Sequence, residues 1–168
     1  MRKVAVIMGS GNDLPVVEKA ILILQKFEVP YEVHVFSAHR TPDAARNFAV
    51  SARENNFGVI IAAAGKAAHL AGAIAANTTI PVIGIPINSS AFGGMDALLS
   101  TVQMPNGVPV ASVAVDGAQN AAILAVQILS LSEEGLSEKL DKLRKEAAEE
   151  VLLSDSDISI KYSRYEKE

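Results

Sequence analysis

The adjacent residues His39 and Arg40 are the pair in this sequence whose side chains best suit catalysis. An imidazole can exchange a proton near neutral pH, and a guanidinium can hold a phosphate or carboxylate through two parallel hydrogen bonds. Together they could act as a proton-transfer group beside an anion-binding group. The residue types alone also fit a pair in an exposed loop without any chemical role.

A glycine-containing segment, Gly9-Ser10-Gly11-Asn12-Asp13, follows the first apolar run of the chain. Ser10, free backbone N–H groups and the start of the next helix together make a general site for a phosphate or carboxylate. Asp13 also suits the N-cap of that helix, and the two interpretations are compatible. The segment is not a dinucleotide-binding fingerprint, because Leu14 stands where a third glycine is needed, and no P-loop Gly-Lys-Ser/Thr follows.

Two further histidines and a lysine are also candidates for ligand binding. His69 precedes an alanine-rich helix, where it could either face the core or contact a ligand. Lys66 could attract an anion or form a Schiff base, although a lysine after a glycine in a turn also fits a solvated loop. His34 lies within a predicted strand and is interpreted as structural. Three histidines without an acidic partner in register do not predict a metal site, and Ser89-Ser90 lacks the elbow of a serine hydrolase.

The elements that must position these residues are short strands alternating with helices. Such alternation is typical of βαβ units and a parallel sheet. The apolar runs cover residues 4–8, 31–36, 59–64, 82–85 and 110–113. The first, third and fourth runs show no alternation of polar and apolar residues, as expected for strands covered by helices on both faces. We predict an α/β protein with a three-layer αβα fold, Rossmann-like or flavodoxin-like, and a parallel five-stranded sheet.

The helix signals fit this fold and add one more helix at the C-terminal end. We predict helices from 13 to 27, from 42 behind a Thr41 cap, from near 67, from near 95, from 117 to 131 and from 133 to 153. The helix over 117–131 is apolar nearly all round, which indicates burial on most sides and contacts with other subunits. We therefore predict a single domain over residues 1–153 and a polar, loosely held tail over 154–168.

The composition excludes several classes of protein. The chain has 168 residues, 49% hydrophobic and 20% charged, which suits one domain with a large core. A net charge of −4 without a basic run argues against nucleic acid and anionic membrane as partners. The absence of cysteine excludes disulfides and suits the cytoplasm. The first apolar run is too short for a signal peptide, and no run approaches the ~20 apolar residues that span a bilayer.

The polar segments with chemical potential all follow predicted strands. They cover residues 9–13, 37–40, 65–69 and 88–94. In an open parallel sheet, ligands bind beyond the carboxyl ends of the strands. The sequence therefore predicts that a small, phosphorylated metabolite binds at this edge.

Four ordered motifs carry a resemblance to one family. They are Met8-Gly9-Ser10-x-x-Asp13, Ser37-Ala38-His39-Arg40-Thr41-Pro42, Ala64-Gly65-x-Ala67-Ala68-His69-Leu70 and Gln103-Met104-Pro105-x-Gly107-x-Pro109-Val110. They resemble the catalytic-subunit family of phosphoribosylaminoimidazole carboxylase. The Ser-Ala-His-Arg and Ala-Ala-His-Leu forms resemble its mutase class, the N5-carboxyaminoimidazole ribonucleotide mutases of de novo purine (IMP) synthesis. The similarity runs from about residue 2 to 153, and position 66 departs from it with Lys where Gly is usual.

The resemblance implies an isomerase that needs no metal, nucleotide or organic cofactor. It implies that His39 is the general acid/base in a decarboxylation followed by recarboxylation of a small ribonucleotide. Because the freed CO2 must not escape, it also implies a closed pocket with residues 65–70 and 88–94 as its walls. The substrate-binding residues it implies are Ser10, Asn12, Asp13, Ser37, Arg40, Gly65, Ala67, His69 and Leu70. It also implies a cytoplasmic homo-octamer, without a nucleic-acid or membrane partner.

Two alternatives to the mutase function remain at this stage. The related class carboxylates aminoimidazole ribonucleotide with free CO2. The other alternative is a flavodoxin-like binding or signalling domain without catalysis. A flavin site needs stacking aromatics, and the predicted loops offer only Phe92; a receiver domain needs clustered acids, and only Asp13 follows the first strand.

Overall fold

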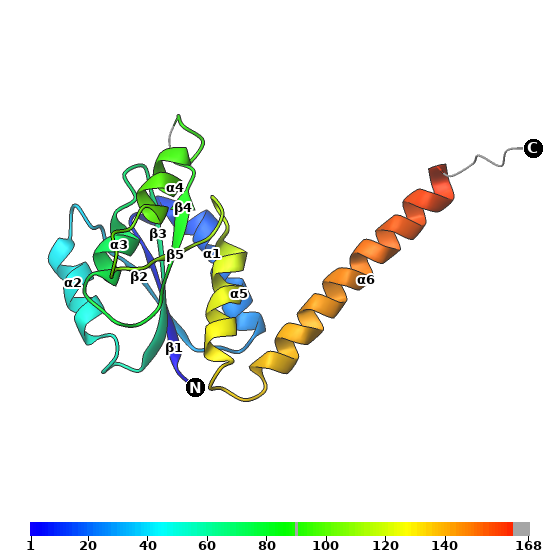
Figure 1. Ribbon diagram of the computed structural model, residues 1–168, viewed down its shortest axis with the longest axis horizontal. Helices are drawn as coiled ribbons and strands as arrows, with labels where there is room; N and C mark the ends of the chain where they lie inside the picture. Colours follow the sequence, from blue (N-terminus) through cyan, green and yellow to red (C-terminus); the bar gives the residue numbers. More distant parts are fainter. Residues whose placement is uncertain (90, 163–168) are drawn as a thin grey trace, which may run out of the picture.

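A computed structural model describes residues 1–89 and 91–162 and contains one five-stranded sheet (Figure 1). The strands are β1 (Lys3–Met8), β2 (Tyr31–Val35), β3 (Phe57–Gly65), β4 (Val82–Ile87) and β5 (Ala111–Ser112). Their spatial order is β2-β1-β3-β4-β5, and all four pairings are parallel. The predicted parallel five-stranded sheet is confirmed.

Helices cover both faces of the sheet, so the predicted three-layer, flavodoxin-like fold is also confirmed. The helices are α1 (Leu14–Lys26), α2 (Pro42–Ser51), α3 (Leu70–Ala75), α4 (Met95–Val102), α5 (Ala118–Leu129) and α6 (Leu136–Tyr162). One core cluster joins the sheet to α1 and α5, and the other joins it to α2 and α3. Helix α4 lies on the same side as α3, because Thr101 and Ala71 both approach Gly84 of β4.

Burial on both faces explains the continuous apolar runs. In β1, Val4 and Val6 belong to the cluster under α1 and α5, whereas Ala5 and Ile7 belong to the cluster under α2 and α3. Every residue of β4 is buried. A strand with apolar neighbours on both sides has no polar face, so its sequence cannot alternate.

Several predicted boundaries are wrong by a few residues. The third helix begins at Leu70 rather than near 67, because the preceding residues form the loop after β3. Strand β5 has only two residues, so it covers the middle half of the predicted run over 110–113. The last helix begins at Leu136 and continues to Tyr162, well past the expected end at 153.

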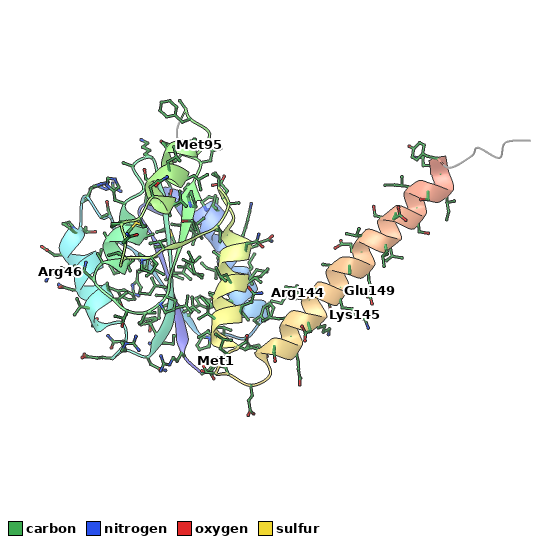
Figure 2. The ribbon with its side chains drawn as sticks, in the orientation of Figure 1. Met1, Arg46, Met95, Arg144, Lys145 and Glu149 are labelled. Carbon is green, nitrogen blue, oxygen red and sulfur yellow. The ribbon has the colours of Figure 1, made fainter. Side chains whose placement is uncertain are left out.

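Helix α6 packs on the domain only through its first turns. Leu136 and Leu140 are buried, whereas Val151 and Ile160 are 68% and 76% exposed. Figures 1 and 2 show the helix leaving the body of the molecule, with Lys145 on its projecting part. The loosely held tail predicted from 154 is therefore helical as far as residue 162, and residues 163–168 lie outside the described part. The division of the chain at residue 153 stays a prediction.

No helix in the described part of the chain is long and apolar enough to cross a membrane.

Candidate active site

The carboxyl ends of β1, β2, β3 and β4 surround a cavity of about 610 Å³. Every residue that the sequence predicted for the site lines this cavity. They are Ser10, Asn12, Asp13, Ser37, His39, Arg40, Gly65, Ala67, His69 and Leu70. Loops distant in sequence meet here because parallel strands end at one edge of the sheet. Their contacts are structural findings, and their roles in binding and catalysis stay predictions.

The turn after β1 is held by Ser10 rather than by Asp13. The Ser10 Oγ accepts a hydrogen bond from the backbone N–H of Asn12 at 3.2 Å and caps a single 3₁₀ turn, Gly11–Asp13. Helix α1 continues from this turn, with Pro15 in its first turn. Asp13 stands at the predicted N-cap position of α1, but its side chain makes no capping hydrogen bond. Its carboxyl group instead lines the cavity.

Asp13 is 8% exposed and carries the buried carboxyl group of the site. Burial raises the pKa of Asp13, because a carboxylate loses solvation inside the protein. A hydrogen bond from the Ser10 backbone and the charge of Arg40 both lower this pKa, but their effects are smaller than the effect of burial. The carboxyl group is therefore placed where its ionised form is costly unless a ligand supplies hydrogen-bond donors.

Arg40 is positioned by the two neighbouring strand ends. Its guanidinium Nη2 donates to the backbone carbonyl of Gly9 at 3.1 Å, and its Nε donates to Ser37 Oγ at 3.4 Å. Thr41 stands at the predicted N-cap position of α2 but makes no capping bond to the helix, because its Oγ1 accepts from the Ser37 N–H at 2.8 Å. These contacts fix the loop after β2 and direct the guanidinium towards the turn after β1.

The two loop histidines meet across the cavity. Nε2 of His39 lies 2.8 Å from Nδ1 of His69, and the ring planes are inclined at 73°. One ring nitrogen must carry the hydrogen and the other must offer its lone pair. The pair links the loop after β2 to the loop after β3 and fixes the orientation of both rings.

The loop after β3 approaches the loop after β4 very closely. A Cβ on Gly65 would overlap Ser89 Oγ and would lie 2.8 Å from Ser89 Cβ, so only glycine fits this contact. Lys66 follows with φ of 56°, a left-handed conformation that favours glycine. Both Lys66 and Ser89 line the cavity, and both fall within the predicted walls over 65–70 and 88–94, although neither was among the predicted substrate-binding residues. Their positions directly after strands were the signal that could have identified them.

The cavity is open to solvent in the single chain. Asn12, Arg40 and both paired histidines are exposed. The closed pocket predicted from sequence is therefore not formed by the described residues of one chain alone. Of the predicted wall over 88–94, Ser89 lines the cavity, and residue 90 lies outside the described part.

His34 lies away from this cavity, in agreement with its structural interpretation. Its ring stacks on Phe36 at a centroid distance of 5.1 Å and contacts Phe48 at 5.0 Å. Within residues 1–89 and 91–162, no three His, Asp or Glu side chains gather in a way that could hold a metal ion.

The arrangement suits proton transfer on an anionic substrate. Arg40 and the turn at Ser10 offer a cation and backbone donors for a phosphate. The buried carboxyl group of Asp13 offers an acceptor for hydroxyl groups. The histidine pair offers a proton donor and acceptor a short distance from that binding region.

The chain is similar to known proteins over most of its length. Residues 3–150 match the family model described as AIR carboxylase. The chain is 56% identical over 146 residues to the N5-carboxyaminoimidazole ribonucleotide mutase of Pyrococcus abyssi, which covers 87% of this chain and 84% of that relative. It is 53% identical over 156 residues to the enzyme of the same name from Bacillus subtilis, covering 92% and 96%. The crystal structure of Treponema denticola PurE superposes with a TM-score of 0.84 at 27% identity, covering 92% of this chain and 97% of that chain.

Proposed function

The chain belongs to the AIR carboxylase family, and from this membership and the geometry of its cavity we propose that it is an N5-carboxyaminoimidazole ribonucleotide mutase. It is an isomerase of de novo purine biosynthesis that moves a carboxyl group from the exocyclic nitrogen to ring carbon C4. The observation that carries the proposal is the contact between His39 and His69 beside Arg40 in a single cavity. This geometry supports the proposal for a chain whose relatives from Pyrococcus abyssi and Bacillus subtilis bear that name.

His39 acts as the general acid and then as the general base. It donates a proton to the carbamate nitrogen while the bond from nitrogen to the carboxyl carbon breaks and releases CO2. The electron-rich C4 then attacks CO2 and forms a carbon–carbon bond. The proton left on C4 returns to His39, so the cycle has no net proton change.

The remaining residues of the cavity bind and orient the ribonucleotide. Ser10, Asn12 and Arg40 bind the 5′-phosphate, because they present hydroxyl, amide and guanidinium donors at the end of β1. Asp13 accepts hydrogen bonds from the ribose hydroxyls. Ser37 supports this set through its hydrogen bonds to Arg40.

The loop after β3 encloses the reacting carboxyl group. The cavity beside His69 is lined by Gly65 at the end of β3, Ala67 in this loop and Leu70 at the start of α3. Their backbone and apolar surfaces hold the freed CO2 near C4, since a gas molecule that escaped would be lost to the reaction. No metal or organic cofactor takes part in the proposed steps.

We also propose that the protein works as a cytoplasmic homo-octamer. The face of α5 away from the sheet, with Ile123 and Leu124, lines an open groove of about 450 Å³ beside α6. The projecting part of α6 also carries exposed apolar side chains, among them Leu152 and Ile158. Apolar surface of this kind is typical of contacts between subunits. The mass in solution, measured by light scattering, tests the assembly, and a stable monomer would contradict it.

An assay with two substrates tests the proposed reaction. The purified protein is expected to convert N5-carboxyaminoimidazole ribonucleotide to the 4-carboxy product without added bicarbonate. It is expected to turn over aminoimidazole ribonucleotide plus bicarbonate far more slowly at the same concentrations. The opposite preference would assign the chain to carboxylation with free CO2, and no turnover of either substrate would exclude both activities.

A further inference from the structure

Lys66 occupies a backbone conformation that lysine adopts only at a cost. Its φ is 56°, in the left-handed region, where glycine is free of the clash between Cβ and the backbone. Residues held in this region are frequent at ligand sites, where the surrounding structure imposes the conformation. A glycine would serve the turn equally well, so the turn itself gives no reason for a lysine side chain here.

The ammonium group of Lys66 is available for a ligand. The residue is exposed and lines the cavity. Among the described residues, it makes no hydrogen bond and no ion pair. Lys142 and Lys145 of α6 differ in this respect, since each lies within 3.9 Å of a glutamate carboxylate.

The balance of charges in the cavity indicates a binding role for this ammonium group. Apart from Lys66, the charged side chains that line the cavity are Arg40 and Asp13, whose charges cancel. The substrate of the proposed function carries a phosphate with about two negative charges and a separate carboxylate. Arg40 can neutralise only part of the phosphate, which leaves Lys66 as the cationic side chain of the lining that can face the carboxylate.

The position of Lys66 determines which of the two anionic groups of the substrate its ammonium group can reach. Ser10 and Arg40 belong to the ends of β1 and β2, whereas Lys66 belongs to the loop after β3, three residues before His69. That loop lies beside the proton-transferring pair. We propose that Lys66 is a specificity-determining residue whose ammonium group binds the carboxylate that this enzyme moves, an inference that rests on the proposed function.

Matched ligands test the proposal directly. One is the 4-carboxyaminoimidazole ribonucleotide product, and the other is the same ribonucleotide with a neutral carboxamide at C4. Titration calorimetry should show that Lys66→Gln weakens binding of the carboxylate ligand about tenfold and changes binding of the carboxamide less than about twofold, since only one ligand offers a charged partner. Lys66→Arg should retain binding of the carboxylate ligand within about threefold.

Two controls separate this role from a general effect of charge or folding. Lys19→Gln removes an exposed lysine of α1 that does not line the cavity, and it should bind both ligands as the parent does. Lys66→Gly should lose carboxylate binding as Lys66→Gln does, yet melt at a temperature no lower than the parent, because glycine relieves the left-handed strain.

The outcomes are distinguishable from failure of the proposed function. Equal losses for both ligands in Lys66→Gln, or no loss for the carboxylate ligand, would overturn the role of Lys66 while the parent still converts N5-carboxyaminoimidazole ribonucleotide. A parent protein that neither binds the product nor turns over that substrate would overturn the proposed function and this inference together.

Discussion

His39 Nε2 and His69 Nδ1 lie 2.8 Å apart, within hydrogen-bonding distance, although the two residues follow different strands. A bond between two imidazole nitrogens uses one N–H and one lone pair. Among the described residues, this is the only hydrogen bond of the His39 ring, so His39 Nδ1 is the ring nitrogen without a hydrogen-bond partner. The contact therefore fixes the ring while leaving a second nitrogen for proton exchange.

Replacement of His39 by asparagine should abolish turnover while the substrate still binds. The amide can form hydrogen bonds but cannot transfer a proton, and loss of general acid–base catalysis typically costs ~10²–10⁴ in rate. Steady-state kinetics of N5-carboxyaminoimidazole ribonucleotide turnover and calorimetry with the product check the two halves of this prediction. Turnover close to that of the parent would remove His39 from the catalytic role.

The partner histidine should act through orientation rather than proton transfer. His69→Ala removes the bond to His39 and should lower kcat by about 10–100-fold, since a misplaced catalytic group loses rate steeply. His69→Asn should recover most of that loss, because its amide can occupy the place of Nδ1 and either donate or accept. Equal kcat values in the two variants would show that the contact does not position His39.

The sheet and the residues around the cavity were predictable from sequence for one shared reason. A residue directly after a parallel strand must lie at the carboxyl edge, so Ser10, His39 and Gly65 were expected to meet. Side-chain partners were not predictable in the same way. Asp13 precedes a helix as an N-cap would, yet the Ser10 hydroxyl three residues earlier holds the turn, and only three-dimensional geometry separates the two.

The length of α6 could not be predicted from the sequence, for a different reason. Its first turns bury Leu136 and Leu140 and could be identified from their helical spacing. The continuation to Tyr162 has polar residues and exposed apolar residues without a partner in the same chain. A helix end predicted from the point where the buried apolar stripe stops therefore falls too early in the chain.

Arg40→Ala should weaken binding of the phosphorylated substrate more than it lowers kcat. The guanidinium is held towards the turn after β1 by Gly9 and Ser37, where it can contact a phosphate. Loss of a charge-assisted contact of about 1.5–3 kcal/mol corresponds to a 10–100-fold rise in Kd. Arg46→Ala is the matched control, because Arg46 is exposed on α2 and points away from the body of the protein (Figure 2). An unchanged Kd in Arg40→Ala would exclude the phosphate contact.

Asp13→Asn should stabilise the unliganded protein at neutral pH and weaken substrate binding. Burial raises the pKa of Asp13 above its ordinary value of 3.8, so the folded state holds the proton more tightly than the unfolded state. The stability contributed by this group is present below pH 3.8 and is lost as pH rises through the folded pKa. Asparagine cannot ionise, so it avoids that loss.

Urea unfolding at several pH values checks the direction of this stability change. The difference in unfolding free energy between Asp13→Asn and the parent should be largest near neutral pH and should shrink as the solution is acidified towards the unfolded pKa. The variant should also lose affinity for the ribonucleotide, because an amide replaces the carboxylate that accepts from ribose hydroxyls. A variant less stable than the parent at neutral pH would mean that Ser10 and Arg40 stabilise the carboxylate by more than burial costs.

Gly65→Ala should destabilise the protein through a clash with Ser89 rather than through backbone strain. The added Cβ would overlap Ser89 Oγ and lie 3.2 Å from the carbonyl oxygen of Ile87. Overpacking of this kind typically costs ~1–3 kcal/mol, which lowers the melting temperature by roughly 2–4 °C per kcal/mol in a protein of this size. The loop after β3 should shift with it, so kcat should fall as well.

Removal of the clashing side chain provides the decisive control. The double variant Gly65→Ala with Ser89→Gly should regain most of the lost melting temperature, although the contact with the Ile87 carbonyl remains. Gly11→Ala introduces the same methyl group where nothing lies within 4 Å, so it should change stability by no more than about 0.5 kcal/mol. If Ser89→Gly gave no recovery, the requirement for glycine at position 65 would lie in the backbone, and the close approach of the two loops would not be its cause.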